Sequence, residues 1–262
     1  MSKDIIPIFS SDASIGKSIL TADEPAEIKD DAPISIWSIA KEYELEKVFI
    51  LEKSFINFIN HYKQAQKLNK QLVFGCRFKI VSDAYDQSEN SLLTESNINI
   101  WMANSSGYND LIKLYTVANA DKNRFYYTGR LQWKDLQQIN NNNLSVTIPF
   151  YNSFLAQNLL EFKHRAIPEW SNIRPRFHIE NHELSFDSII EKAVLSYVKE
   201  NKLDVINSHQ IYYMRDKDIL PAQIMRCIIN RSSFDCPDLN HFSSNKFSFE
   251  SYLNKGGHKL NG

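Results

Sequence analysis

The sequence lacks several features that would identify a function at once. Its three cysteines, Cys76, Cys227 and Cys236, match no zinc-ligand spacing and no disulfide framework, which favours a reducing compartment. The 30 Lys and Arg residues are balanced by 31 Asp and Glu residues, so strong direct binding of nucleic acid through its phosphates is not expected. No apolar run approaches the ~18 residues of a membrane helix, and the N-terminus has no signal-peptide pattern. We therefore expect a cytoplasmic protein that does not enter a membrane.

The composition does supply enough apolar material for a folded core. Hydrophobic residues make up 43% and aromatic residues 12% of the chain, unlike a disordered or collagen-like protein. At about 150 residues per domain, a length of 262 residues leaves one large domain or two small ones open. The composition therefore predicts a globular protein without deciding its domain count.

Short apolar or β-branched runs alternate with longer segments of helical period along the chain. The predicted strands are residues 5–9, 48–51, 72–75, 98–103, 144–149, 176–180 and 203–206. The predicted helices are residues 34–44, 54–70, 108–118, 133–140, 151–160, 186–201 and 217–231. Such a (β/α) series closes into a barrel or forms an open, doubly wound parallel sheet, and the period alone does not choose between them.

In either architecture a functional site is expected where the strands end, at their carboxyl ends. Asn104 follows the fourth predicted strand, and its side chain is not a typical metal ligand. Only the sixth and seventh strand ends carry residues that bind metals, namely His178, Glu180, His182 and His209. His178 and His182 share a face in a strand as well as in a helix, and a polar strand edge is the simpler interpretation of the pair. The residues alone thus predict an α/β domain with a poorly equipped site.

Several stretches, in the same order along the chain, resemble one known family. The most specific is Ala-Asn-Ser-Ser-Gly-Tyr-Asn-Asp-Leu at residues 103–111, which is similar to the family's Ala-x-Asn-x-x-Gly-Tyr-x-Asn-Leu stretch. Further similarities lie at residues 11–14, 60–65, 72–78, 125–127, 204–214 and 247–253. Together they resemble the PHP (polymerase and histidinol phosphatase) domain that begins the alpha subunit of bacterial C-family, polymerase III type, DNA polymerases. The resemblance implies a distorted seven-stranded (β/α) TIM-like barrel.

The chain departs from this family at its metal ligands. The family's ligands are, in order, two opening histidines, an Asp-His pair, a glutamate, a histidine, a cysteine, and a final Asp and His. In their place stand Ile8 and Ser10, Leu51 and Glu52, Arg77, Asn97, Phe150, and Gln210 and Tyr212. Apolar and amide groups do not replace imidazole or carboxylate, and Arg77 would put a cation where metal ions belong. We therefore expect no metal, no other cofactor and no catalytic residue.

The resemblance implies a role in DNA replication without catalysis. Residues 1–262 would form a single PHP-like domain, with the barrel in 1–246 and an extension in 247–262 toward the point where a polymerase palm would begin. This domain would be a structural and binding module for the C-family polymerase catalytic region, fused or separate, and for a proofreading exonuclease. It would work in the bacterial cytoplasm, or in that of a host if a phage encodes it.

Two alternatives remain open. The first is a metal-dependent phosphoesterase or 3′–5′ exonuclease with zinc or manganese in a rebuilt site of Asp12, Glu52, His178, Glu180 and His209. The second is an accessory protein-binding factor with no connection to a polymerase.

Overall fold

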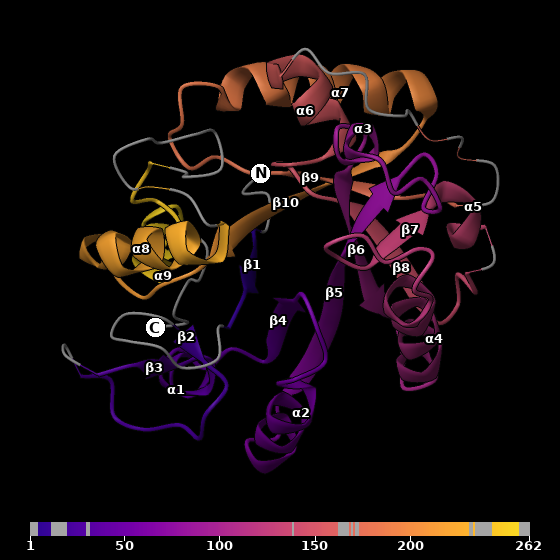
Figure 1. Cartoon of the computed structure of the whole chain (residues 1–262). Helices are drawn as coiled ribbons and strands as arrows, with labels where there is room; N and C mark the ends of the chain where they lie inside the picture. Colours follow the sequence, from indigo (N-terminus) through magenta and orange to yellow (C-terminus); the bar gives the residue numbers. More distant parts are fainter. Residues whose placement is uncertain are drawn as a thin grey trace. The chain divides into compact units, whose positions relative to one another are not determined.

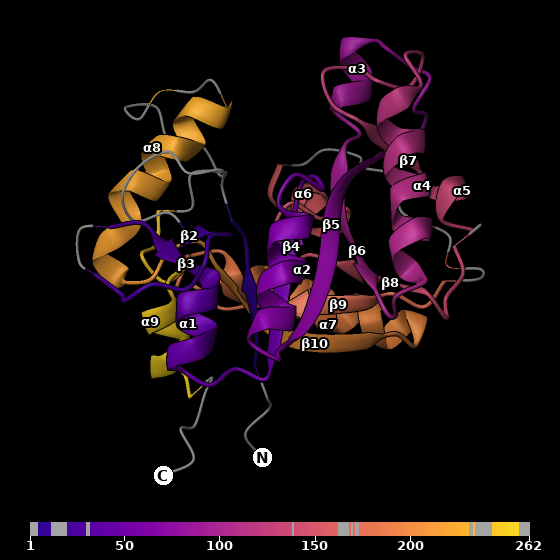
Figure 2. The ribbon, with the colours of Figure 1, turned by 90° about the horizontal axis from the view of Figure 1, so that it is seen from below.

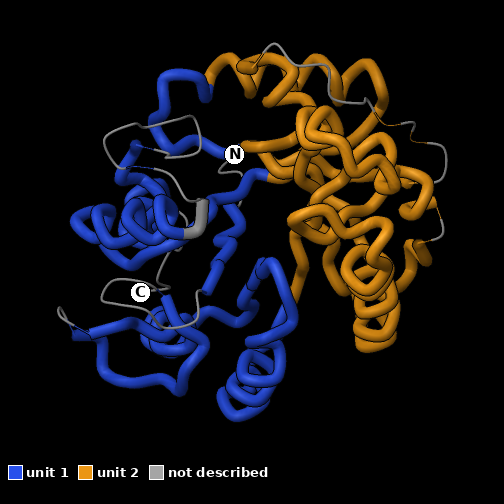
Figure 3. The backbone as a smooth tube through the Cα atoms, in the orientation of Figure 1, with its two compact units in different colours: residues 1–73, 180–187, 207–262 blue, residues 74–179, 188–206 orange. Residues whose placement is uncertain are grey.

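The structure is a computed structural model that describes residues 5–11, 20–29, 32–137, 139–161, 168, 170, 173–230, 233 and 243–256. The chain divides into two compact units (Figure 3). Unit 1 contains residues 1–73, 180–187 and 207–262, and unit 2 contains residues 74–179 and 188–206. Two strands, β5 (Gln71–Val81) and β10 (Asp204–Ile211), contain the boundaries and so belong to both units.

The strand pairings close the main sheet into a barrel, and Figure 1 labels its strands. Its order is β4 (Lys47–Glu52), β1 (Ile6–Phe9), β10, β9 (Arg176–Ile179), β8 (Leu144–Ile148), β6 (Ser96–Met102), β5 and β7 (Arg130–Gln132). A further pairing of β4 with β5 closes the ring of seven strands and leaves β7 outside it. The predicted mixed α/β, TIM-like barrel is confirmed.

Unit 1 combines β1 and β4 with a small parallel sheet and several helices. These are β2 (Leu20–Thr21), β3 (Ile34–Ser35), α1 (Ile36–Glu42), α2 (Phe58–Lys67), the 3₁₀ helix η1 (Asp216–Asp218), α8 (Ile219–Asn230) and α9 (Phe249–Asn254). Serine residues cap the N-termini of two of these helices. The hydroxyl of each serine accepts a hydrogen bond from a backbone N–H that would otherwise be unpaired. Ser35 accepts from Trp37 at α1, and Ser248 accepts from Ser251 at α9.

Unit 2 contains the remaining helices and the middle of the barrel sheet. The helices are α3 (Glu89–Leu92), α4 (Gly107–Ala120), α5 (Trp133–Leu136), α6 (Phe154–Glu161) and α7 (Asp187–Asn201), whose first residue lies in unit 1. Along β5 and β6, Arg77 and Asn99 alternate with buried apolar neighbours. These neighbours are Cys76, Phe78, Ile98 and Ile100. The alternation puts Arg77 and Asn99, which are paired in register, on the same face of the sheet.

The direction of β6 corrects the expectation of a wholly parallel sheet. This strand is antiparallel to both of its neighbours, β5 and β8. The connection before it holds only α3, which has four residues, instead of the crossover helix that a parallel return requires. β6 ends at Met102, so Asn104, two residues later, lies away from the carboxyl ends of the parallel strands. The start of β6, with Asn97 and Asn99, lies toward those ends instead.

Other differences concern element lengths. β5 continues to Val81 and β10 continues to Ile211, so Ser208, His209 and Gln210 lie within a strand rather than after one. The short strands β2, β3 and β7 were not predicted. No helix in the described part of the chain is long and apolar enough to cross a membrane.

Candidate functional site

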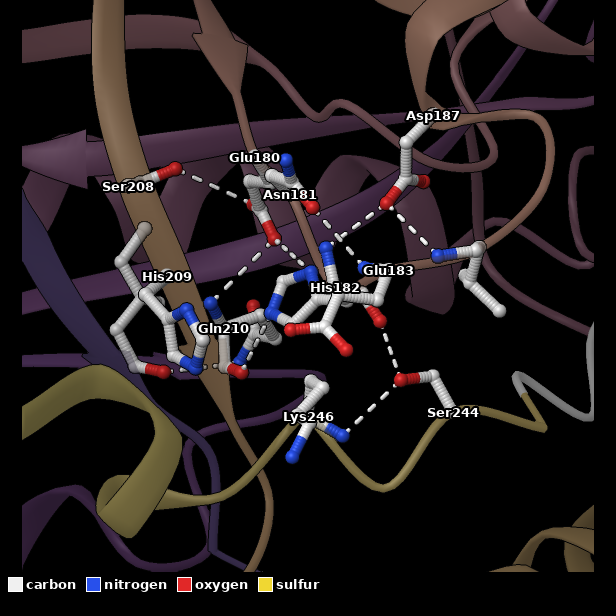
Figure 4. A network of polar contacts seen from close by, with 12 residues as sticks. Glu180, Asn181, His182, Glu183, Asp187, Ser208, His209, Gln210, Ser244 and Lys246 are labelled. Atoms are coloured by element: carbon white, nitrogen blue, oxygen red, sulfur yellow. Dashed lines mark hydrogen bonds and ion pairs between the residues drawn. The ribbon is translucent and has the colours of Figure 1, made fainter. Parts of the chain in front are cut away.

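A buried carboxylate, Glu180, lies at the centre of a polar network in unit 1 (Figure 4). Its Oε1 accepts a hydrogen bond from Ser208 Oγ at 3.2 Å, and its Oε2 accepts one from the Gln210 backbone N–H at 3.4 Å. His182 Nδ1 lies 3.6 Å from the same Oε2. Ser208 and the Gln210 backbone thus each donate to one carboxylate oxygen of Glu180, which offsets the cost of burying the residue.

The side chain of Gln210 joins the ends of β10 and β1. Its Nε2 donates to the backbone oxygen of Ile8 at 3.1 Å and to Ser10 Oγ at 3.0 Å. Ser10 Oγ in turn donates to the backbone oxygen of Leu51 on β4 at 2.8 Å. Gln210 and Ile8 are buried and Ser10 is half-buried. Three adjacent strands are therefore linked at this end by an amide and a hydroxyl.

A second buried carboxylate, Glu52, contacts both Ser11 and His61. Its Oε1 accepts from the Ser11 backbone N–H at 3.0 Å and from the Ser11 hydroxyl at 2.6 Å. His61 Nε2 lies 3.5 Å from the same oxygen and 3.3 Å from Ser11 Oγ. Asn57 Nδ2 also donates to Ser11 Oγ, at 3.1 Å. The polar groups of this cluster are paired with one another.

The protonation of His61 is fixed by Trp37. The indole Nε1 donates to His61 Nδ1 at 3.1 Å, and because an indole N–H can only donate, Nδ1 must accept. The ring proton is then on Nε2, which faces Ser11 and Glu52. A histidine in this tautomer does not take a proton from the Ser11 hydroxyl through Nε2. The Ser11, His61 and Glu52 group is consequently not arranged as a serine-nucleophile triad.

Two imidazoles of unit 1, those of His182 and His209, lie next to each other in the interior. The His182 ring lies on Phe247 with centroids 3.7 Å apart, and the His209 centroid is 4.4 Å from that of His182. His182 Nε2 donates to the backbone oxygen of Gln210 at 3.3 Å, and His209 Nε2 donates to that of Ser248 at 3.2 Å. Burial lowers the pKa of His209 to about 4 and that of His182 well below its usual value. Both rings are neutral near pH 7.

In unit 2 the polar residues of β5, β6, β8 and β9 include cations and no acid. Arg77 Nε donates to Asn99 Oδ1 at 3.0 Å, and a 2.8 Å hydrogen bond joins His178 Nε2 to Thr147 Oγ1. Burial, followed by the positive charges of Arg77 and Arg176, lowers the pKa of His178 to about 3. Strands β5 to β9 contain no Asp or Glu residue, and Asp204 stands at the exposed first position of β10. Arg77 and Arg176 therefore supply positive charge close to the buried His178.

The comparison with known families identifies the fold. Residues 33–178 match the family model described as the PHP domain, which is more than half of the chain. The chain belongs to the PHP family. No curated protein matches it.

The residues present do not fit the metal centre that the PHP family implies. Ile8, Leu51 and Phe150 are buried apolar side chains. The Gln210 amide is bonded to Ile8 and Ser10, and the Arg226 guanidinium lies 4.3 Å above the Tyr212 ring. Asn97, at the start of β6, is half-buried. Within the described ranges, no three His, Cys, Asp or Glu side chains are grouped so as to hold a metal ion.

The residues of the alternative rebuilt site have separate partners. Glu52 contacts Ser11 and His61, and Glu180 contacts Ser208 and His182. The ring nitrogens of His178 and His209 contact Thr147 and Ser248. Asp12 lies outside the described residues.

Sequence reasoning missed His61 as a partner of a carboxylate. Glu52 is nine positions away in the sequence, on another element, so no motif joins the two residues. The available signal was the buried stripe of α2, in which His61 takes an apolar position between Phe58 and Ala65. A histidine on such a stripe needs buried polar partners, and here these are Trp37 and Glu52.

Proposed function

We propose that this chain is a catalytically inactive PHP-like module of a C-family replicative DNA polymerase. It would hold the polymerase catalytic region, fused or separate, and a proofreading exonuclease, in the cytoplasm of a bacterium or of a phage host. The observation that carries the proposal is the hydrogen bonding of Gln210 to Ile8 and Ser10. The resemblance puts these three residues at family ligand positions, and Gln210 is hydrogen-bonded to both of the others.

Hydrogen bonds connect the strand ends at this end of the barrel. In a metal-bearing PHP site, ligands from the first and last barrel strands would converge on shared ions. In this chain the Gln210 amide and the Ser10 hydroxyl span the same strand ends with hydrogen bonds of 2.8 to 3.1 Å. Such bonds satisfy the buried groups without an ion, so the barrel end needs no metal for its stability.

Electrostatics supports the same proposal. Arg77 stands where the family has a glutamate, and Arg176 adds a second positive charge to the same unit. A divalent cation close to a fixed guanidinium is repelled, and in a partly buried site the repulsion amounts to several kcal/mol. The missing ligands and the added cation both oppose metal binding.

An activity assay tests the inactive assignment. Full-length protein is incubated with p-nitrophenyl phosphate and with a 3′-labelled single-stranded oligonucleotide, each with manganese or zinc added. We expect no turnover above that of the heat-denatured protein. Turnover that requires the metal and is lost in Glu180→Gln and Glu52→Gln would overturn the assignment.

The Glu52 and Glu180 carboxylates are also the basis of a second candidate function, that of a metal-dependent phosphoesterase or 3′–5′ exonuclease. Glu52 and Glu180 are both buried, and an imidazole lies 3.5 Å and 3.6 Å from them, respectively. The zinc or manganese ion would need further ligands, such as Asp12, His178 or His209. The assay above separates this candidate from the first.

A binding assay tests the polymerase role. The full chain is mixed with the purified catalytic region of a C-family polymerase from the same source and analysed by size-exclusion chromatography. Co-elution supports the role. Separate elution, together with capture of other proteins from the native source, would favour the accessory factor that is unconnected to a polymerase.

A further inference from the structure

Two loops of unit 2, residues 83–91 and 121–130, are held together as one surface, near α3 and β7 in Figure 2. Gln87 Nε2 donates to three backbone oxygens of the other loop, those of Lys122, Asn123 and Phe125, at 3.0, 3.1 and 3.3 Å. One side-chain amide thus fixes the path of the second loop against the first.

A fully buried arginine fixes both loops from beneath. Arg130 Nη1 donates to Ser91 Oγ at 2.8 Å, and Nη2 donates to the backbone oxygens of Ala84 and Asp86 at 2.9 and 3.0 Å. Its Nε donates to the backbone oxygen of Arg124 at 3.2 Å. The planar guanidinium satisfies carbonyls of both loops at once, so the surface is preorganised.

This surface exposes aromatic rings to solvent. Tyr85 is 52% exposed, Phe125 is 43% exposed and Tyr127 is 74% exposed. The Arg124 guanidinium lies 5.4 Å from the Tyr85 ring centroid, and the rings of Tyr126 and Tyr127 are 4.6 Å apart. The three rings lie on loops that Gln87 and Arg130 hold together, and exposed aromatic rings are typical of interaction sites, where tyrosine contributes much of the binding energy.

The backbone at Tyr127 is strained. Its φ is 59°, in the left-handed region that a bulky residue disfavours. A glycine would adopt this conformation without strain, and Gly129 is only two positions away in the same loop. Among the described residues, the most exposed aromatic ring is thus held in a conformation that costs folding energy, as is often found at functional sites.

The charge of the two loops indicates which class of partner they would bind. The two loops carry three exposed carboxylates, those of Asp83, Asp86 and Glu89, and one exposed cation, Lys122. The other two cations of the loops are internal, since Arg124 pairs with Asp135 and Arg130 is fully buried. A hydrogen bond from the Ser88 backbone lowers the pKa of Asp86, which keeps that carboxylate ionised. The aromatic rings are therefore bordered by negative charge.

We propose that Tyr85, Phe125 and Tyr127, with Asp86 and Glu89, bind an arginine- or lysine-rich segment of a partner protein. Cations pack on the faces of tyrosine rings while the carboxylates supply opposite charge. The phosphates of a nucleic acid would be repelled by the same carboxylates, so stacking of bases on these rings is disfavoured. The proposal is independent of the polymerase role, because it uses none of the former ligand positions.

Binding of a defined peptide tests the proposal. The probe is a fluorescein-labelled peptide of four Gly-Arg repeats, and the matched probe carries citrulline, which has the same size and no charge, in place of arginine. We expect the full chain to bind the arginine peptide about tenfold more tightly than the citrulline peptide, with an affinity that falls as salt is added. Equal anisotropy changes with the two peptides would overturn the proposal.

Variants separate a binding role from a structural one. Tyr127→Gly relieves the left-handed strain, so we expect an unchanged or higher Tm together with about tenfold weaker peptide binding. The double variant D86N/E89Q should also weaken binding. The matched controls, Tyr62→Ala on α2 and E191Q/E200Q on α7, remove an exposed ring and exposed charges elsewhere and should leave binding unchanged.

Two outcomes contradict the proposal. In the first, Tyr127→Gly binds the arginine peptide as well as the parent chain does, or the control variants lose as much affinity as the loop variants. In the second, a labelled twelve-residue oligothymidylate binds more tightly than the arginine peptide and loses its affinity in Tyr127→Gly. The surface would then be a single-strand stacking site.

Discussion

At the scale of single residues, hydrogen-bonded side chains stand at positions where the resemblance to the PHP family implies metal ligands. Gln210 and Ser10 connect strand ends, and Trp37 fixes the tautomer of His61. That these are replaced ligand positions stays a prediction from the resemblance. The new partners could not be predicted from the sequence, since Gln210 and Ile8 are 202 positions apart and only the β1–β10 register brings them together.

Replacing Gln210 should lower stability. Gln210→Ala removes two hydrogen bonds and leaves the buried Ile8 carbonyl without this donor, so we expect a loss of about 1–3 kcal/mol in the free energy of unfolding. Urea denaturation measures it. Gln66→Ala on the exposed face of α2 is the control and should change the free energy by less than about 0.5 kcal/mol. Equal effects in the two variants would show that the Gln210 bonds are not structural.

The buried histidines should make stability depend on pH. Their pKa values are lower in the folded chain than in the unfolded chain, about 3 for His178 and about 4 for His209. Below about pH 6.5 the unfolded chain therefore binds protons that the folded chain does not, and each histidine costs up to ~1.4 kcal/mol of stability per pH unit. We expect the free energy of unfolding to fall as the pH drops from about 6.5 toward 4 and to change little from these groups above about pH 7.

Urea denaturation near pH 7 and near pH 5 measures this dependence. His209→Gln should reduce the difference between the two values, because it removes one of the groups whose pKa is lowered by burial. Equal stability of the parent chain at the two pH values would contradict the assignment of neutral, buried imidazoles.

At the scale of elements, the seven barrel strands could be located from hydrophobic period, but their directions and lengths could not all be predicted. The alternation of polar and apolar residues from Cys76 to Val81 was available as a signal for a longer β5. The polar run of β10 from Asn207 to Gln210 gave no such signal, because its strand conformation depends on pairing with β1. The antiparallel β6 likewise depends on pairing that local sequence does not encode.

Replacing Arg130 should destabilise the two loops that carry the exposed aromatic rings. Arg130→Lys keeps the charge but cannot reproduce the forked bonds to Ser91, Ala84 and Asp86, and it leaves buried carbonyls unpaired. We expect a loss of about 2–4 kcal/mol in the free energy of unfolding and faster amide exchange at residues 83–91 and 121–130. The control is Arg174→Lys, at an exposed position. Unchanged exchange in both loops would refute the role assigned to Arg130.

At the scale of the whole molecule, the chain has the PHP fold, while the loss of the family's metal ligands stays a prediction from the sequence resemblance. The family match and the closed sheet establish the architecture. The interior is stabilised by apolar burial and by paired polar groups. Among these groups are the Arg77 guanidinium and the Gln210 amide, at positions where the resemblance implies acidic metal ligands. A fold of this kind can be retained for binding, since fold and function are separable.

The most direct test of this account is the metal content of the intact chain. Protein purified without chelators is dialysed against manganese and, separately, against zinc, and the bound ions are measured by mass spectrometry. The account predicts no stoichiometric metal in the parent chain, and no difference between it and variants at Ser208 or Gln210. One or more tightly held ions per chain that are lost on substitution of Ser208 or Gln210 would contradict it.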